Sequence, residues 1–223
     1  MLARHSCQTW GVSEHHDRLR TARLYLVCGE APDAFLHAAL RGGVDIVQLR
    51  CKDAEDNRIL AAGARVAAAC SAHGALFILN DRPDLAAELG ADGVHVGQDD
   101  ASVASARGLV GHDRIVGLST HSPDQIDAAA QMGVDYIGVG PVYATPTKPG
   151  RSPVGLDLVR YAAGRASMPW FAIGGVDADT VSEVAEAGAR RIAVVRALTQ
   201  SADLPVAART LLDGLRERAG AGA

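Results

Sequence analysis

Eight short runs of β-branched and aliphatic residues occur between Leu24 and Arg196, and Ala-rich stretches separate them. In order, the runs are LYLVCG, IVQLR, ALFILN, GVHVG, RIVGLS, YIGVG, WFAIGG and RIAVVR. Stretches such as SPDQIDAAAQMG and DADTVSEVAEAGA space their apolar residues as helices do, and they begin at Ser or Asp, which cap helices well. Eight alternating strand and helix units predict an α/β fold, a single (β/α)8 TIM barrel.

A repeated Gly before alternate strands supports the barrel. The segments GGVDIVQL, GADGVHV, GVDYIGV and GARRIAV each place a helix-ending Gly just before a strand, about once in two units. This repeat is expected if alternate strands occupy equivalent places around a ring. The competing fold is an open doubly wound sheet, which more often carries a GxGxxG turn after its first strand. The segment VCGEAPDAF lacks that pattern.

The charge and composition limit both the partners and the core. The formal net charge of −4 predicts no long-range attraction to nucleic acid or to an anionic membrane, so a bound anion must be held by local groups. Small molecules are therefore the expected partners, and the oligomeric state stays open, a homo-oligomer included. Hydrophobic residues make up 48% of the chain but aromatic residues only 4%, so we expect a core of Ala, Val, Leu and Ile without rings.

The four cysteines indicate a reducing compartment. Cys7, Cys28, Cys51 and Cys70 form no CxxC pair and no metal-ligand spacing. No export signal and no apolar run of membrane-spanning length is recognised. We therefore expect reduced thiols in a cytoplasmic protein.

The first 22 residues are the part of the chain with no clear periodicity. They are expected to form a mobile or loosely packed N-terminal extension, with His15 and His16 in a solvated tail rather than at a metal. The barrel domain would then comprise residues 23–223.

The polar residues that finish the predicted strands form the candidate site, because the C-terminal ends of the strands carry the active site of a barrel. Gln48, Arg50 and Lys52 alternate along the second strand and its extension, so their side chains point to one side. Asp81 and Asp100 finish the next two strands. The other strand ends supply Asn80, Gln98, Asp99, Ser119, His121, Gly174, Gly175, Val195 and Arg196.

Asp81 and Asp100 can converge on one cation because their strands are neighbours. Two carboxylates that leave other positions to water and phosphate oxygens are the usual arrangement for Mg2+. Two other interpretations stay open: each Asp caps the following helix, or the pair works as acid and base, as in glycosidases. We discount the acid/base pair because Arg50 and Lys52 would stabilise both carboxylates as anions. A guanidinium and an ammonium beside a metal would suit a diphosphate.

A second anion site is predicted on the opposite strands. AIGGVDADT places two glycines after the seventh strand, and VVRALTQ turns from the eighth strand towards a helix. Barrels often bind a phosphate there through backbone amides, although a Gly pair alone is most often only a turn. The loop of residues 141–153 brings Thr145, Thr147 and Lys148 between the two anion sites, and we interpret it as a lid.

The chain shows no nucleophilic triad and no Schiff-base lysine. This suits a reaction in which diphosphate leaves and Mg2+, Arg50, Lys52 and Lys148 stabilise its charge. His95, in GVHVG, is interpreted as a hydrogen-bonded core residue, because the alternation along its strand does not clearly aim it at the site.

Taken together, the motifs QLRCKD, LNDRPD, DGVHVGQDD, GLSTH, GPVYATPTK, AIGGV and VVRAL resemble the thiamine phosphate synthase family, in order and at the expected strand ends. The resemblance extends from Arg23 to about Leu211. It implies a Mg2+-dependent transferase that condenses 4-amino-2-methyl-5-hydroxymethylpyrimidine diphosphate with 4-methyl-5-(2-phosphoethyl)thiazole, or its carboxylated form. The products would be thiamine phosphate and pyrophosphate. A carbocation from the pyrimidine, captured by the thiazole nitrogen, would need no general base.

The resemblance also implies a role for each matching residue. The residues that would hold the pyrimidine diphosphate are Gln48, Arg50, Lys52, Asn80, Ser119 and Lys148. Of these, Arg50, Lys52, Ser119 and Lys148 would be catalytic. The residues that would line the thiazole phosphate site are Thr145, Pro146, Thr147, Gly175, Val195 and Arg196. Asp81 and Asp100 would hold Mg2+, with Asp100 preferred to Asp99 by its position in the motif.

One position departs from the family, and two rival functions remain. Many family members carry a serine where this chain has Arg196, so a guanidinium would replace a hydroxyl at the phosphate. The nearest rival is a thiazole tautomerase of the same fold, an isomerase that handles no diphosphate and would not need two carboxylates and two basic residues together. The other is a non-catalytic barrel that binds a phosphorylated ligand.

Overall fold

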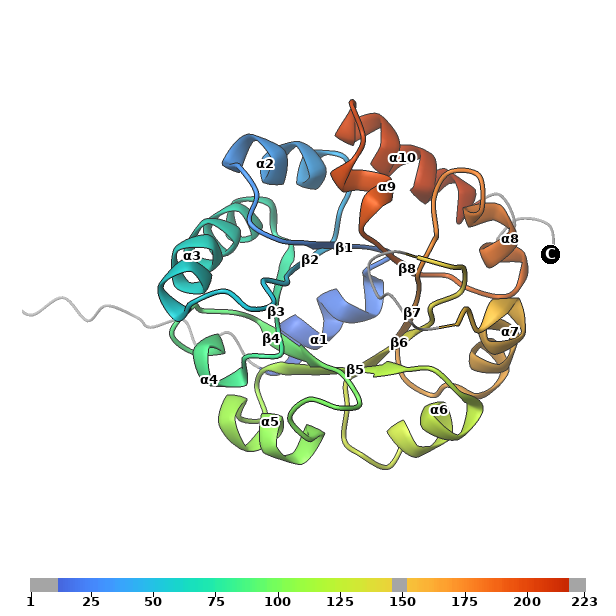
Figure 1. The fold of residues 1–223 in the computed structure, drawn as a ribbon, viewed down its shortest axis with the longest axis horizontal. Helices are drawn as coiled ribbons and strands as arrows, with labels where there is room; N and C mark the ends of the chain where they lie inside the picture. Colours follow the sequence, from blue (N-terminus) through green and yellow to red (C-terminus); the bar gives the residue numbers. More distant parts are fainter. Residues whose placement is uncertain (1–11, 146–151, 217–223) are drawn as a thin grey trace, which may run out of the picture.

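The computed structural model describes residues 12–145 and 152–216 of the chain. Eight parallel strands close into a barrel in chain order, with β8 paired to both β7 and β1 (Figure 1). This closure confirms the predicted TIM barrel and excludes the open sheet. The strands are β1 (Leu24–Cys28), β2 (Ile46–Leu49), β3 (Leu76–Asn80), β4 (Gly93–Val96), β5 (Ile115–Thr120), β6 (Tyr136–Val139), β7 (Trp170–Ile173) and β8 (Ile192–Val194).

Helices surround the strand ring and cover its outer face, largely with Ala, Val and Leu (Figure 1). Ser122 caps α6 as predicted, since its Oγ accepts a hydrogen bond from the Gln125 N–H. Within the described ranges, no helix is long and apolar enough to cross a membrane. The helices of the ring are α2 (Asp33–Arg41), α3 (Asp56–His73), α4 (Pro83–Ala86), α5 (Val103–Val110), α6 (Pro123–Ala129), α7 (Gly155–Arg165), α8 (Val181–Glu186), α9 (Arg196–Thr199) and α10 (Leu204–Gly214).

The inside of the barrel is filled by alternate residues of the strands, as the two-residue period of a strand requires. Its middle holds the rings of Tyr25, Tyr136 and Phe171, whose centroids lie 5.3, 5.7 and 5.9 Å apart. Gly117 makes room for them, because a Cβ at that position would lie 2.1 Å from Tyr136 Cζ. The prediction of a core without rings is therefore wrong for the barrel interior, where several of the chain's few aromatic residues are concentrated.

A helix, α1 (Val12–Thr21), covers the N-terminal end of the barrel. Leu19 and Ala22 are 1% exposed and pack into the barrel interior, and Arg18 Nη2 donates to the Ala75 carbonyl at 2.7 Å. The prediction of a loosely packed extension is thus wrong for residues 12–22. Periodicity gave little signal because few residues of α1 are apolar and its polar side chains attach it to the strand starts. Residues 1–11 lie outside the described part.

The histidine pair of α1 is also better ordered than a solvated tail. His15 Nδ1 lies 3.1 Å from an Asp92 carboxylate oxygen, and His16 Nε2 lies 3.1 Å from Asp135 Oδ1. Their side chains are only 24% and 23% exposed. Both histidines therefore join α1 to the segments that precede β4 and β6.

The Gly-containing repeat places an aspartate before β2, β4 and β6. Asp45 accepts hydrogen bonds from the N–H groups of Arg23 and Leu24 at 2.7 and 3.0 Å. In the same way, Asp92 accepts from Phe77 at 2.8 Å and Asp135 from Val116 at 2.7 Å. Each carboxylate thus satisfies the first N–H groups of the preceding strand. The structure confirms that the repeat marks equivalent places around the ring.

Three cysteines fall within the described residues, and all of them are free thiols. Burial raises the pKa of the Cys28 thiol to about 12, and it also raises the pKa of Cys70. Neither is a reactive thiolate at neutral pH. Cys7 lies outside the described part.

Candidate active site

A cavity of about 280 Å³ lies at the C-terminal ends of the strands, and every strand contributes to its lining. The residues that were given a substrate or metal role and lie within the described ranges all line it: Gln48, Arg50, Lys52, Asn80, Asp81, Asp100, Ser119, Thr145, Gly175, Val195 and Arg196. Two other residues of the predicted strand ends, Gln98 and Asp99, are not part of the lining. The other three residues given such a role, Pro146, Thr147 and Lys148, lie outside the described part of the chain. The structure therefore brings together the residues of both predicted anion sites.

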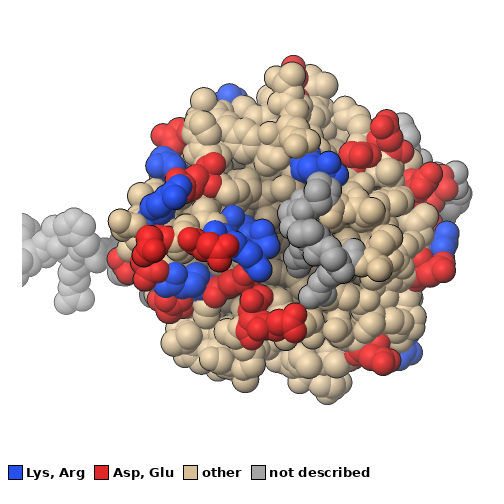
Figure 2. All heavy atoms as spheres, viewed as in Figure 1, with Lys and Arg blue, Asp and Glu red and all other residues tan. Residues whose placement is uncertain are grey.

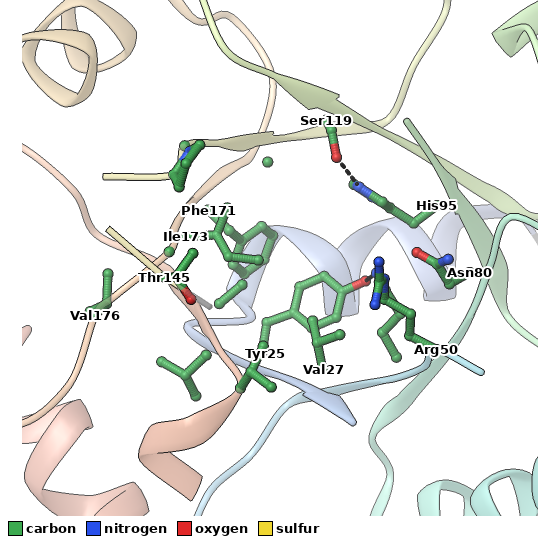
Figure 3. Close-up of a pocket in the computed structure, with 18 of the residues that line it drawn as sticks. Tyr25, Val27, Arg50, Asn80, His95, Ser119, Thr145, Phe171, Ile173 and Val176 are labelled. Atoms are coloured by element: carbon green, nitrogen blue, oxygen red, sulfur yellow. Dashed lines mark hydrogen bonds between the residues drawn. The ribbon is translucent and has the colours of Figure 1, made fainter. Parts of the chain in front are cut away.

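The two ends of the cavity differ in chemistry. Figure 3 shows Arg50 and Asn80 on one side and Thr145 and Val176 on the other. In the space-filling view, charged side chains of both signs gather on the side of the face that carries β2 to β4 (Figure 2). The end near β7 and β8 is instead lined largely by backbone and apolar groups.

Alternate residues of β2 reach the charged end. Gln48, Arg50 and Lys52 all line the cavity, as their two-residue spacing predicts. The Arg50 N–H donates to the Cys28 carbonyl at 2.8 Å, which continues the β1–β2 pairing past the last residue of β2. The backbone therefore holds the guanidinium at the mouth of the barrel.

Asp81 and Asp100 lie at the same end, and neither caps the helix that follows it. The N-cap of α4 is Arg82, and that of α5 is Ser102, whose side chain accepts from the Ser105 N–H. Asp100 instead accepts from the Gly97 N–H at 2.9 Å, and Asp81 accepts from the Asn80 side-chain amide. The helix-cap interpretation is thus wrong. Asp100 lines the cavity, as the motif position suggested.

The backbone of Asp81 is in the left-handed region, with φ at +59°. Non-glycine residues rarely adopt this conformation, and Asp and Asn tolerate it best. With this backbone conformation, the Asp81 carboxylate points towards Asp100 and does not cap α4. Backbone strain of this kind is common at functional sites.

Burial and the neighbouring Asp100 raise the pKa of Asp81 to about 6, while Asn80 and Lys52 oppose the shift only in part. Lys52 stabilises the Asp81 anion as predicted, but burial and Asp100 outweigh it, so the net pKa shift of Asp81 is upward. Asp81 is half-buried and Asp100 is exposed. Two carboxylates this close repel each other, and a divalent cation would relieve the repulsion. Within the described ranges, no group of three or more His, Cys, Asp or Glu is placed to hold a metal ion together. A cation held by Asp81 and Asp100 would therefore keep positions for water and phosphate, as Mg2+ does.

The two glycines after β7 form the opposite end. Gly174 and Gly175 have φ of +101° and +68°, and a Cβ on either would come within 2.6 Å of Pro141 or Tyr143. The Tyr143 N–H donates to the Gly174 carbonyl at 2.9 Å. The glycines thus serve a close approach of two loops as well as forming the lining beside Arg196.

Sequence reasoning missed the floor of the cavity. Tyr25, Tyr136 and His95 all line it, and His95 bonds to Tyr136 and Ser119. The prediction that His95 is hydrogen-bonded is confirmed, but the doubt about its direction was wrong. The residues two positions before and after His95 are glycines, so the inward face of this strand showed no pattern of side chains. Val94 and Val96 point outward into the helix-covered core, and their alternation with His95 could have predicted that His95 points inward.

This chain is similar in sequence to thiamine-phosphate synthases. The model of the thiamine monophosphate synthase family matches residues 24–198. Thiamine-phosphate synthase from Thermus thermophilus is 51% identical over 201 residues, which cover 86% of this chain and 97% of that protein. Thiamine-phosphate synthase from Nostoc punctiforme is 47% identical over 204 residues, covering 91% of this chain. The chain spans only 58% of the length of that relative.

Solved structures agree with the sequence relatives. Thiamine phosphate pyrophosphorylase from Pyrococcus furiosus superposes with a TM-score of 0.81 at 28% identity, covering 91% of this chain and 98% of that one. A 3-hexulose-6-phosphate synthase superposes with a TM-score of 0.65 at 20% identity, covering 86% of this chain and 99% of that one. The second likeness shows the fold alone.

Proposed function

The chain belongs to the thiamine monophosphate synthase family, and on that premise we propose that it joins a pyrimidine diphosphate to a thiazole phosphate. Thiamine phosphate would form and pyrophosphate would leave. The observation that carries the proposal is the single cavity whose two ends differ: basic and carboxylate side chains at one, loop backbone and Arg196 at the other. Two phosphorylated substrates that react with each other need such an arrangement.

The diphosphate would lie at the charged end. Arg50 offers a guanidinium fork and Lys52 an ammonium, and both line the cavity beside Asn80 and Ser119. These four groups are donors, so each becomes more favourable as negative charge builds on the leaving diphosphate. Lys148 is proposed to join them on family resemblance.

Asp81 and Asp100 would hold Mg2+, and their mutual repulsion in the metal-free protein supports this role. When bound, Mg2+ would supply positive charge to the diphosphate oxygens. The chain's part is to fix two carboxylates side by side, Asp81 by its left-handed backbone and Asp100 by its bond to the Gly97 N–H.

The thiazole phosphate would lie at the end formed by Gly175, Val195 and Arg196, with Thr145 beside it. We propose that Pro146 and Thr147 complete this end. The exposed Arg196 would give the phosphate a charged partner where family members often have a serine. The aromatic floor of Tyr25 and Phe171 lies between the two ends (Figure 3).

The bond-forming step that we propose needs no base. The pyrimidine C–O bond breaks with its electron pair going to the diphosphate, and the thiazole nitrogen lone pair then captures the carbocation. A ring nitrogen without a hydrogen has no proton to lose. The buried aromatic floor, with Tyr25 and Phe171, would limit the access of water, which would otherwise trap the cation.

Pyrophosphate release tests the proposal. The pyrimidine diphosphate and the thiazole phosphate are supplied singly and together, with Mg2+ or with EDTA. We expect release only with both substrates and the metal. Folded protein that releases no pyrophosphate in any mixture would contradict the transferase, and conversion of a thiazole tautomer by that protein would identify the isomerase instead.

A further inference from the structure

Five side chains at the floor of the cavity form one continuous line of hydrogen bonds. Gln48 Nε2 donates to the Tyr25 hydroxyl at 2.7 Å, and the Tyr25 and Tyr136 hydroxyls lie 2.8 Å apart. The Tyr136 hydroxyl lies 2.9 Å from His95 Nδ1. On the other side of the ring, His95 Nε2 lies 2.9 Å from Ser119 Oγ (Figure 3). The line crosses the barrel from β2 to β5, and both of its ends line the cavity.

Four of the five members of the line are buried, and His95 is partly exposed. Gln48, Tyr25, Tyr136 and Ser119 are 4%, 2%, 1% and 8% exposed. Burial raises the pKa of both tyrosines well above the ordinary value, so each phenol keeps its proton at neutral pH. Each tyrosine hydroxyl therefore has a single hydrogen to donate within the line.

Counting these hydrogens gives the line a direction. The Tyr25 oxygen accepts from Gln48, and the Tyr136 oxygen, 2.8 Å away, is the acceptor that the line offers to the Tyr25 hydrogen. The Tyr136 hydrogen then goes to His95 Nδ1, which must be the unprotonated ring nitrogen. A neutral His95 consequently carries its proton on Nε2 and donates it to Ser119 Oγ. The hydroxyl hydrogen of Ser119 is not used in this bond and stays available to the cavity.

We propose that Tyr25, Tyr136 and His95 are positioning residues that make Ser119 a hydrogen-bond donor to the leaving diphosphate. If the line ran the other way, Ser119 would donate to His95 Nε2 and would present only an oxygen lone pair to the anion. The identity of the acceptor rests on the proposed function, whereas the direction of the line is a property of the protein alone. The same line connects Gln48, proposed to contact the pyrimidine, with the serine at the diphosphate.

The tautomer of His95 tests the direction without any substrate. Two-bond 1H–15N spectra of uniformly 15N-labelled protein at neutral pH distinguish a protonated ring nitrogen from an unprotonated one, and His95→Gln identifies the signals. We expect Nε2 protonated and Nδ1 unprotonated. In Gln48→Glu the carboxylate can only accept from Tyr25, so the line should reverse and the proton should move to Nδ1. A wild-type His95 that is protonated on Nδ1, or on both nitrogens, would overturn the proposal.

A double-mutant cycle tests whether the line acts through Ser119. Tyr136→Phe keeps the ring between Tyr25 and Phe171 but removes the hydroxyl that bonds to Nδ1. We expect kcat for pyrophosphate release to fall about tenfold with little change in either KM, less than the ~100-fold loss expected when a donor such as Ser119 is itself removed. In a Ser119→Ala background, Tyr136→Phe should then have no further effect. Multiplicative losses in the double variant would contradict a role through Ser119.

The control is Tyr161→Phe on α7, which removes an exposed hydroxyl that bonds to Asp127 of α6 at 2.8 Å. It should change neither kcat nor the His95 spectrum. The two proposals can fail separately. If His95 shows the expected tautomer but the protein releases no pyrophosphate, the transferase proposal is wrong and the direction of the line still holds. Normal release with the opposite tautomer removes the line and leaves the transferase. The wild-type spectrum decides the direction even if a variant does not fold.

Discussion

At the N-terminal end of the barrel, Asp45, Asp92 and Asp135 each accept hydrogen bonds from backbone N–H groups, whereas at the C-terminal end Asp81 and Asp100 lie against each other. The first group of carboxylates is surrounded by donors and joins neighbouring strands. In the second pair, burial and the neighbouring Asp100 raise the pKa of Asp81. Aspartate thus stabilises the fold at one end of the barrel, and at the other end a pair of aspartates would be stabilised by a bound cation.

The largest effect should come from removing the charge of Asp81. In Asp81→Asn, the amide tolerates the left-handed backbone, so the fold should persist while Mg2+-dependent turnover falls about 1000-fold. The measurement is pyrophosphate release across a Mg2+ titration. The matched control is Asp53→Asn, because Asp53 also has a positive φ, +62°, and is exposed. Normal turnover in Asp81→Asn would remove the metal assignment.

At the opposite end, Asp135→Ala should lower stability and leave chemistry alone. It leaves the Val116 N–H without its side-chain acceptor and removes the carboxylate that lies 2.6 Å from the guanidinium of Arg107, a side chain that is 17% exposed. We expect a loss of about 3 kcal/mol in the free energy of unfolding. Urea titration measures it, with kcat per folded molecule unchanged.

The control for that variant is Asp213→Ala on α10. Asp213 forms a long, exposed pair with Arg216 at 3.5 Å, so its loss should leave the urea midpoint in place. If both variants lose equal stability, the bonds of Asp135 to Val116 and Arg107 do not account for the loss in the free energy of unfolding.

Arg196→Ser tests whether the two ends of the cavity bind different substrates. The KM for the thiazole phosphate should rise roughly fivefold, a modest effect because Arg196 is exposed. The KM for the pyrimidine diphosphate should stay the same. Equal changes in both constants would contradict the division of the cavity into two anion-binding ends.

The smallest effect has the opposite sign. In EDTA at pH 7, Asp100→Asn should raise the free energy of unfolding by about 1 kcal/mol, a figure reduced for solvent screening, because it removes the like charge beside Asp81. Below its folded pKa of about 6, Asp81 binds a proton, so the gain should disappear as the pH falls towards 4. Urea titrations at the two pH values measure this. A loss of stability at pH 7 would show that the two carboxylates do not repel each other.

The strands and the polar rim could be predicted because their signals are local. All eight strands were found, since each is a short apolar run between helical stretches. Alternation was enough to bring Gln48, Arg50 and Lys52 to one side. The rim needed only the rule that strand ends converge in a barrel.

The floor of the cavity and the position of α1 could not be predicted, because both depend on contacts between residues far apart in the sequence. Tyr25 and Tyr136 are 111 positions apart in the sequence and meet only when the barrel closes. The pKa of Asp81 depends on burial as well as on charge, and burial could not be read from strand ends. The order of α1 likewise comes from distant partners such as Ala75 and Asp135.

Those distant partners imply an order of events during synthesis. The helix α1 leaves the ribosome before any strand, yet the groups it binds follow at residues 75, 92 and 135, and Arg191 donates to the Arg20 carbonyl at 2.6 Å. Because α1 is made before these partners, it must wait for more than half of the barrel sequence before it can dock. The base of the barrel is thus sealed late in translation, and the nascent helix spends that interval without its native partners.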